Sequence, residues 1–139
     1  MGYHSDLSGE ITFNPPIPWG ELQDSEFISP GGNAEWRRLV WLRMVEETVE
    51  TSEGTLTRKQ AVAIRPSDAG ELRAGPLVSQ LQEIVTKHGE GRTFDGHILV
   101  LGECSPDIWR VQVEDGKAVE VRPRIVWPDG VEVNFNDHI

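Results

Sequence analysis

The chain has 139 residues, a single cysteine, and a formal net charge of −10 from 23 acidic and 13 basic side chains. This length fits one domain, residues 1–139, that can bury its own core. The lone Cys104 excludes an intrachain disulfide, the charge opposes general binding to nucleic acid phosphates, and no apolar run approaches the roughly 20 residues of a membrane span. We therefore expect a cytoplasmic protein with no membrane segment and no direct contact with nucleic acid.

The first predicted element is a strand over residues 8–14, where Ile11 and Phe13 alternate with polar side chains. Residues 15–18 contain three prolines, which lack backbone donors, so we expect sheet pairing to end there. Pro18 then suits the first position of a short helix. This structural role needs no partner, although the same residues also have the Pro-x-x-Pro spacing of a ligand for an aromatic groove.

The first quarter of the chain is wholly acidic. No Lys or Arg precedes Arg37, so this part carries −6, and the 13 basic and 17 acidic side chains that follow contribute −4. A solvated surface is the ordinary reason for such a run. The alternative is a site for a basic partner, with Glu21, Asp24 and Glu26 as its candidate residues. Residues 25–35 read as a loop.

Three turns that end in glycine predict hairpins, at residues 52–54, 114–116 and 128–130. In each, a three-residue loop places the apolar side chains of both strands on one face, whereas a two-residue loop sends them to opposite faces. The predicted pairs are Leu42 with Ile64, Met44 with Val62 and Glu47 with Lys59 in the first hairpin, Val111 with Val119 and Arg110 with Glu120 in the second, and Trp127 with Val131, Ile125 with Val133 and Pro123 with Phe135 in the third.

One main helix is predicted at about residues 76–88, between Pro76 and Gly89. An apolar stripe at helical spacing marks its buried side, and His88 lies in its last turn, where it meets the helix dipole. Residues 94–101 read as a strand covered on at least one face. The order of elements predicts an α+β fold: an antiparallel sheet of hairpins with the main helix packed on one face and a short helix after Pro18.

Common catalytic and cofactor motifs are missing from the sequence. It has no nucleophile elbow, phosphate loop or dinucleotide fingerprint, and its four histidines are too scattered for a zinc motif, so no cofactor and no metal are expected. The best catalytic candidates are Asp95 and His97, which alternate onto one face of a strand, where a carboxylate can orient an imidazole. A surface histidine is the ordinary alternative.

Binding has more support than catalysis. Arginines in the last two hairpins are predicted to face away from the apolar side, where they can clamp carboxylates or phosphates. A tryptophan beside arginines in the first hairpin suits an interface hot spot. The alternative for the arginines of the last two hairpins is an ordinary solvated face, and the alternative for the tryptophan group is a second apolar layer. The candidate binding residues are Arg110, Arg122 and Arg124 in the first group, and Trp41, Arg43 and Arg65 in the second.

Three segments carry a resemblance: "GYHSDLSGEITFNPPIPW", "GRTFDGHILVLGE" and "PDIWRVQVEDGKAVEVRPRIVWPDG". Together they resemble an uncharacterised actinobacterial (Streptomyces-type) and phage family of short proteins, a domain of unknown function. The resemblance implies a compact α+β fold and an actinobacterial or phage setting. It assigns no catalytic residues.

These observations favour a non-enzymatic accessory or inhibitor protein that binds a protein partner. Its acidic first quarter suits a basic or nucleic-acid-handling partner, in the extreme as a mimic of nucleic acid. Two alternatives stay open: a small hydrolase that uses Asp95 and His97, and an immunity or antitoxin-like protein that neutralises a basic toxin.

Overall fold

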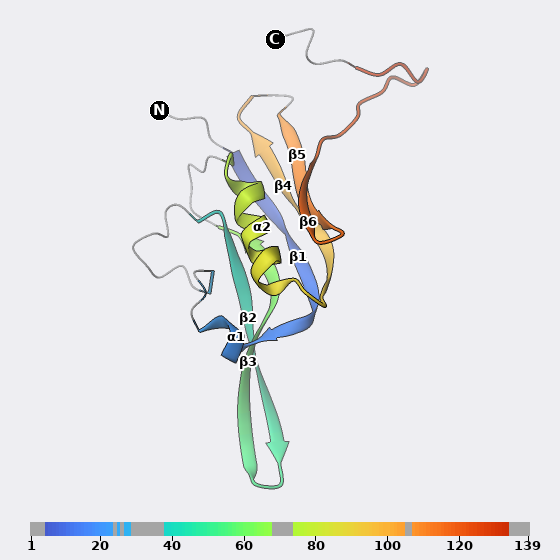
Figure 1. Ribbon diagram of the computed structural model, residues 1–139. Helices are drawn as coiled ribbons and strands as arrows, with labels where there is room; N and C mark the ends of the chain where they lie inside the picture. The colour runs from blue at the N-terminus through green and yellow to red at the C-terminus, as the bar shows by residue number, and fades with distance from the viewer. Residues whose placement is uncertain are drawn as a thin grey trace.

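The computed structural model describes residues 5–23, 25, 27–28, 38–67, 74–104 and 107–133. Six antiparallel strands form one sheet in the order β2-β3-β1-β4-β5-β6 (Figure 1). The elements are β1 (Ser5–Pro18), α1 (Trp19–Leu22), β2 (Val40–Thr51), β3 (Gly54–Pro66), α2 (Leu77–His88), β4 (Thr93–Gly102), β5 (Ile108–Glu114) and β6 (Lys117–Val121). The α+β prediction is confirmed in outline, with little helix. The predicted loop over residues 25–35 lies mostly outside the described residues, as does Phe135.

The core lies between α2 and one face of the sheet, which we call the inner face. The helix begins after Pro76 and ends before Gly89, and its apolar stripe is buried, as the spacing predicted. Alternate residues of the central strands meet it. The buried side chains are Leu77, Leu81, Ile84 and Val85 on the helix, and Ile11, Phe13, Ile64, Ile98, Val100, Trp109 and Val111 on the strands. The opposite side of the sheet is the outer face.

The proline segment belongs to β1, so the prediction that pairing ends at the prolines was too strict. Pairing with β4 does end at Asn14, opposite Thr93. Pairing with β3 stops after Thr12 and resumes at Ile17. Pro15 and Pro16 fall inside this irregularity, where no ladder bond is required of them, and Pro18 lies opposite Gln60 at the end of the strand. Ile17 is almost fully buried, so the strand returns to the core after the prolines.

The turn at residues 128–130 matches its prediction. The Gly130 N–H donates to the Trp127 carbonyl (2.8 Å), and Gly130 has φ 89°. The Trp127 N–H donates to the Val131 carbonyl (2.8 Å), and the Val133 N–H donates to the Ile125 carbonyl (2.7 Å). A three-residue loop that ends in a left-handed glycine therefore sets this register.

The prediction for the turn after β5 was wrong. Only Asp115 and Gly116 form the loop, and their φ angles of 50° and 76° fit a type I′ turn. Val111 consequently lies opposite Glu120, and Val119 lies on the outer face. The prediction assumed that only one face of the sheet is apolar. Because the outer face also carries apolar side chains at this end, alignment of the valines did not decide the register.

The prediction for the first hairpin was right as far as Arg43 and wrong beyond it: Met44 pairs with Ala61 and not with Val62, and Glu47 pairs with Arg58 and not with Lys59. Leu42 pairs with Ile64 as predicted, but Thr51 pairs with Gly54 across a two-residue loop. A register shift after Arg43 reconciles the two ends. Both faces of the tip lie in water, so the register shift exposes no additional apolar side chains there. The bulge at the shift keeps Leu42 in the core.

Candidate functional site

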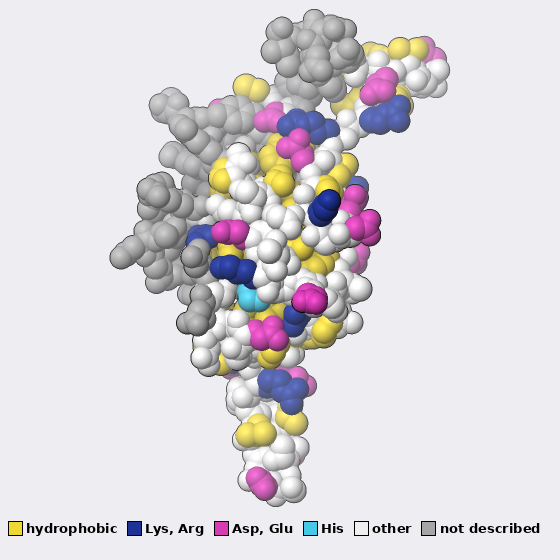
Figure 2. All heavy atoms as spheres, viewed as in Figure 1, with side chains coloured by type: hydrophobic (Ala, Val, Ile, Leu, Met, Phe, Trp, Pro, Cys, Tyr) yellow, Lys and Arg dark blue, Asp and Glu magenta, His cyan; other side chains and the backbone are white. Residues whose placement is uncertain are grey.

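Two ribbons project from the body of the protein (Figure 1). One is the far end of the β2–β3 hairpin, residues 46–59. The other follows β6 and comprises residues 122–133, which we call the C-terminal arm. Figure 2 shows hydrophobic side chains along the arm, at the upper right, with an acidic side chain at its tip and basic and acidic side chains nearer its base. Beyond Arg122, the arm runs clear of the sheet.

The C-terminal arm exposes large apolar side chains. Trp127 is 61% exposed, Val131 58%, Val126 51% and Ile125 42%. Trp127 and Val131 lie opposite each other and Ile125 lies opposite Val133, so these four residues share one side of the ribbon. An isolated two-stranded ribbon is marginally stable in water unless its apolar side packs against something. The arm therefore has the character of an interaction surface.

The arm balances its own charge. The Arg124 Nη2 lies 3.1 Å from the Glu132 Oε2. Arg122 at its base pairs with Glu120 (3.1 Å) and approaches Asp107 (3.7 Å). The arm also contains Asp129, so its two arginines and two acidic residues give residues 122–133 a net charge of zero. A contact made by this ribbon consequently depends on apolar burial more than on electrostatic steering.

The outer face of the sheet carries a second apolar surface at the same end of the fold. On β4 and β5 its members alternate with buried core residues, and on β6 they flank the exposed Glu120. Their registers make them neighbours across the three strands. Leu101 is 42% exposed and the others are half-buried. We call this surface the outer patch; it consists of Leu99, Leu101, Ile108, Val119 and Val121. Exposed Arg110 lies at its centre, between Leu99 and Val121.

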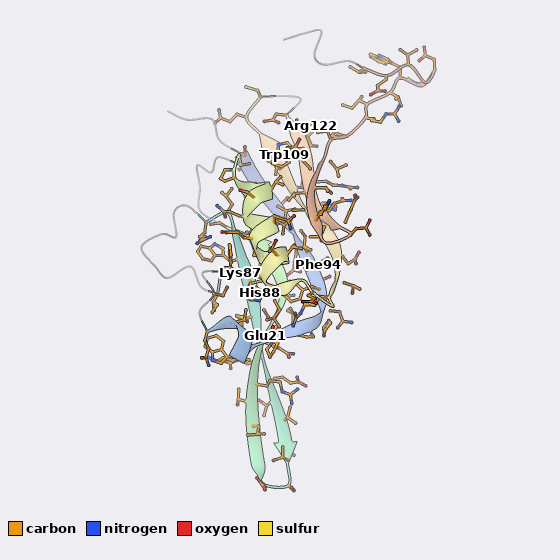
Figure 3. The ribbon with its side chains drawn as sticks, in the orientation of Figure 1. Glu21, Lys87, His88, Phe94, Trp109 and Arg122 are labelled. Atoms are coloured by element: carbon orange, nitrogen blue, oxygen red, sulfur yellow. The ribbon has the colours of Figure 1, made fainter. Side chains whose placement is uncertain are left out.

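The three arginines predicted to share one face do not share it. Arg110 is on the outer face, opposite Val121 and not opposite Glu120. Arg122 takes the other side of the chain, where its guanidinium lies 5.8 Å from the centre of the Trp109 ring (Figure 3). Arg124 belongs to the arm. All three are exposed, but the two-residue loop after β5 separates them, so no common anion clamp forms.

Trp41, Arg43 and Arg65 are brought together on the outer face, as predicted. Trp41 pairs with Arg65 across β2 and β3, and Arg43 is the next residue on the same face. The Arg43 Nε donates to the Glu10 Oε1 at 2.5 Å, so this guanidinium is already engaged by a carboxylate of β1. Arg65 is exposed and Trp41 is half-buried. Whether this group binds a partner stays a prediction.

The other predicted site residues are scattered. Asp95 and His97 lie on the outer face of β4, as the alternation predicted, with Asp95 exposed and His97 half-buried opposite Glu10. Glu21 in α1 lies 3.6 Å from the Arg92 guanidinium. Asp24 and Glu26 lie outside the described residues. The Thr12 hydroxyl donates to the backbone carbonyl of Asp95 at 3.3 Å.

A polar cluster ties the end of α2 to α1 (Figure 3). His88 is half-buried, its Nε2 is buried, and that nitrogen has no hydrogen-bond partner among the described residues. Burial lowers the pKa of His88; the nearby Glu21 acts in the opposite direction, and Arg92 and Lys87 lower the pKa further. The predicted position of His88 in the last turn of α2 is correct.

This lowered pKa makes stability depend on pH. The unfolded chain binds a proton at His88 near pH 6.5, and the folded chain does so only at lower pH, so stability is complete above pH 6.5 and falls as the pH drops below it. Chemical denaturation at pH 7.5 and 5.5 should show a loss for the wild type that is smaller in His88→Gln. The contribution of His88 to the slope of the unfolding free energy against pH cannot exceed about 1.4 kcal/mol per pH unit, and partial exposure of the side chain reduces it.

Equal losses in the wild type and in His88→Gln would contradict the assignment.

Sequence reasoning missed the arm as a surface and the outer patch altogether. A signal was present: positions 119, 121, 125 and 127 are all apolar and all odd, which is the period of one strand face running from β6 into the arm. That pattern was read as the packed side of the sheet. Only the placement of α2 on the other face shows that this side is open.

Within the described residues, no helix is long and apolar enough to cross a membrane. The same residues hold no group of three or more His, Cys, Asp or Glu side chains that suits a metal ion. Comparison with curated proteins and with solved structures finds no match. A family of unknown function, DUF6205, matches residues 1–136, which is nearly the whole chain. The chain therefore belongs to this family of unknown function, which agrees with the predicted domain of unknown function.

Proposed function

We propose that this protein works by binding another protein chain through its C-terminal arm, and that it is a non-enzymatic accessory or inhibitor protein. The observation that carries the proposal is the exposure of Ile125, Trp127 and Val131 on one side of a ribbon that projects from the body. Large exposed apolar patches on soluble proteins mark interaction sites. Tryptophan is among the residues that contribute most to interface affinity.

The charge of the chain favours a basic partner for the body of the protein. The net charge is −10 and the arm contributes nothing to it, so the field of the body attracts cations and repels phosphates. Glu21 is exposed and belongs to the acidic first quarter that the sequence singled out. Capture of a basic partner that is unchanged after Glu21, Asp24 and Glu26 are replaced by Gln would remove this part of the proposal. An actinobacterial or phage setting, implied by the resemblance, belongs to the same proposal.

Photo-crosslinking in cells tests the arm directly. A photoreactive amino acid in place of Trp127 should give a discrete crosslinked protein band, because this side chain is at the centre of the proposed contact. The matched control places the same residue at Leu56, which is 59% exposed on the other ribbon. We expect at least tenfold less product there. No discrete product at Trp127, or equal products at both positions, would reject the arm as a binding surface.

A further inference from the structure

We infer that the partner of the C-terminal arm is a second copy of this chain, with each arm packed on the outer patch of the other copy. This inference rests on the proposed function, since it takes the arm to be a protein-binding surface. Its starting point is that one chain carries two open apolar surfaces at the same end of the fold. A two-fold axis covers both surfaces in both copies at once, because an isologous interface pairs surface i with j and j with i.

The two surfaces are continuous along the chain. Val119 and Val121 belong to the outer patch, and alternate positions lead from them to Ile125 and Trp127 on the arm. An extended segment of six residues reaches roughly 20 Å, and three neighbouring strands span about 10 Å. The arm is therefore long enough to cross the outer patch of a partner copy.

Area decides between two ways of pairing the copies. From their exposed fractions, Ile125, Trp127 and Val131 offer roughly 250 Å² of apolar surface. Two arms packed only on each other bury about 500 Å², well below the roughly 1,000 Å² of a specific interface. Arms packed on patches add the surface of Leu101 and its neighbours in both copies. This doubles the area to roughly 1,000 Å², which suits a weak but specific dimer.

Charge is compatible with this arrangement. The arm is neutral, so it brings no net repulsion to the outer patch of an acidic partner. Arg110, at the centre of that patch, has no ion pair among the described residues, and the tip of the arm carries Asp129. The bodies repel each other, however, because each contributes the full −10. Dimerisation should therefore strengthen as salt screens the repulsion, whereas contact with a basic partner weakens with salt.

Analytical ultracentrifugation of the purified chain over a concentration series measures the dimer directly. We expect a dissociation constant on the order of 10 µM, tighter at 0.5 M than at 0.05 M salt, as befits an interface at the small end of the specific range. Trp127→Ser should raise the dissociation constant roughly 30-fold or more, and Leu101→Ser should raise it about tenfold. The matched control Leu56→Ser removes an equally exposed side chain from the other ribbon and should leave it unchanged.

Mixing the two defective variants distinguishes exchanged arms from arms that pair with each other. Each variant alone has lost both contacts, but a mixed dimer keeps one intact contact, between the arm of the Leu101→Ser chain and the patch of the Trp127→Ser chain. The mixture should therefore dimerise more strongly than either variant alone. Circular dichroism and melting temperature check that all variants fold, and their exposed positions predict that they do.

Three results would overturn the inference: a wild type that stays monomeric throughout, a mixture no better than its components, or equal weakening by Leu56→Ser. These failures leave the proposed function intact if the photo-crosslink at Trp127 contains a different protein. A crosslink that contains only peptides of this chain supports both. No crosslink at all rejects both.

Discussion

Replacing Gly96 with alanine is expected to lower the free energy of unfolding by roughly 3 kcal/mol or more, which can unfold a domain of marginal stability. Gly96 lies on β4 with φ +100°, a backbone conformation that side chains rarely adopt. A Cβ at this position would meet the carbonyl oxygen of Glu10 on β1. Gly9 on β1 has the equivalent geometry: its φ is +97°, and a Cβ there would meet the carbonyl oxygen of His97 on β4. The two central strands thus approach closely at a pair of glycines.

Denaturant midpoints measure this loss, and Gly20→Ala serves as the matched control. Gly20 lies in α1, has no left-handed φ, and has no neighbouring atom within 4 Å of the point that an alanine Cβ would occupy. Its replacement should change the free energy of unfolding by less than about 1 kcal/mol, and in the stabilising direction. A Gly96→Ala protein as stable as the Gly20→Ala protein would show that β1 and β4 do not meet in this way.

Arg92→Gln is expected to cost about 2–4 kcal/mol, the second large effect. The Arg92 side chain is only 10% exposed, and its guanidinium joins two parts of the chain. It donates to the carbonyl oxygens of Pro15 (2.9 Å), Pro16 (3.2 Å) and His88 (2.7 Å). Hydrogen bonds from a charged donor contribute about 1.5–3 kcal/mol each, and their loss leaves acceptors without donors.

Arg110→Gln is the control for this substitution, because it makes the same chemical change at an exposed site. We expect a change within about 0.5 kcal/mol there. Thermal and chemical denaturation of both variants, run at pH 7.5 so that His88 is neutral, give the comparison. Similar stabilities for the two variants would mean that Arg92 does not hold the proline segment.

The role of Arg92 also explains the proline segment that the sequence singled out. The prolines were expected to end one element and begin another, and they do lead into α1. Their carbonyls have a second task, as acceptors for a side chain 76 and 77 positions further along. Local rules for proline concern its missing donor and its fixed φ, so they contain no information about such a distant donor.

Turn register shows where local rules suffice. The loop at residues 128–130 was predicted correctly, because Gly130 supplies the left-handed third residue that a three-residue loop needs. The loop at Asp115 and Gly116 was predicted wrongly. Its register depends on the burial of Val111 beneath α2 and on the apolar side chains of the outer face. Because the valines of β6 could lie on either face of the sheet, their alternation did not determine the register.

The amino-acid sequence alone determined the α+β class, the bounds of α2, the strand that follows it, and the alternation that places Trp41, Arg43 and Arg65 on one face, because these depend on periodicity and on glycine and proline within a few residues. Tertiary structure alone decided which side of the sheet α2 covers. That choice opens the outer patch and leaves the C-terminal arm free of the core, and the register set by the loop after β5 separates Arg110 from Arg122. Burial is a property of elements packed together, so no local pattern contains it.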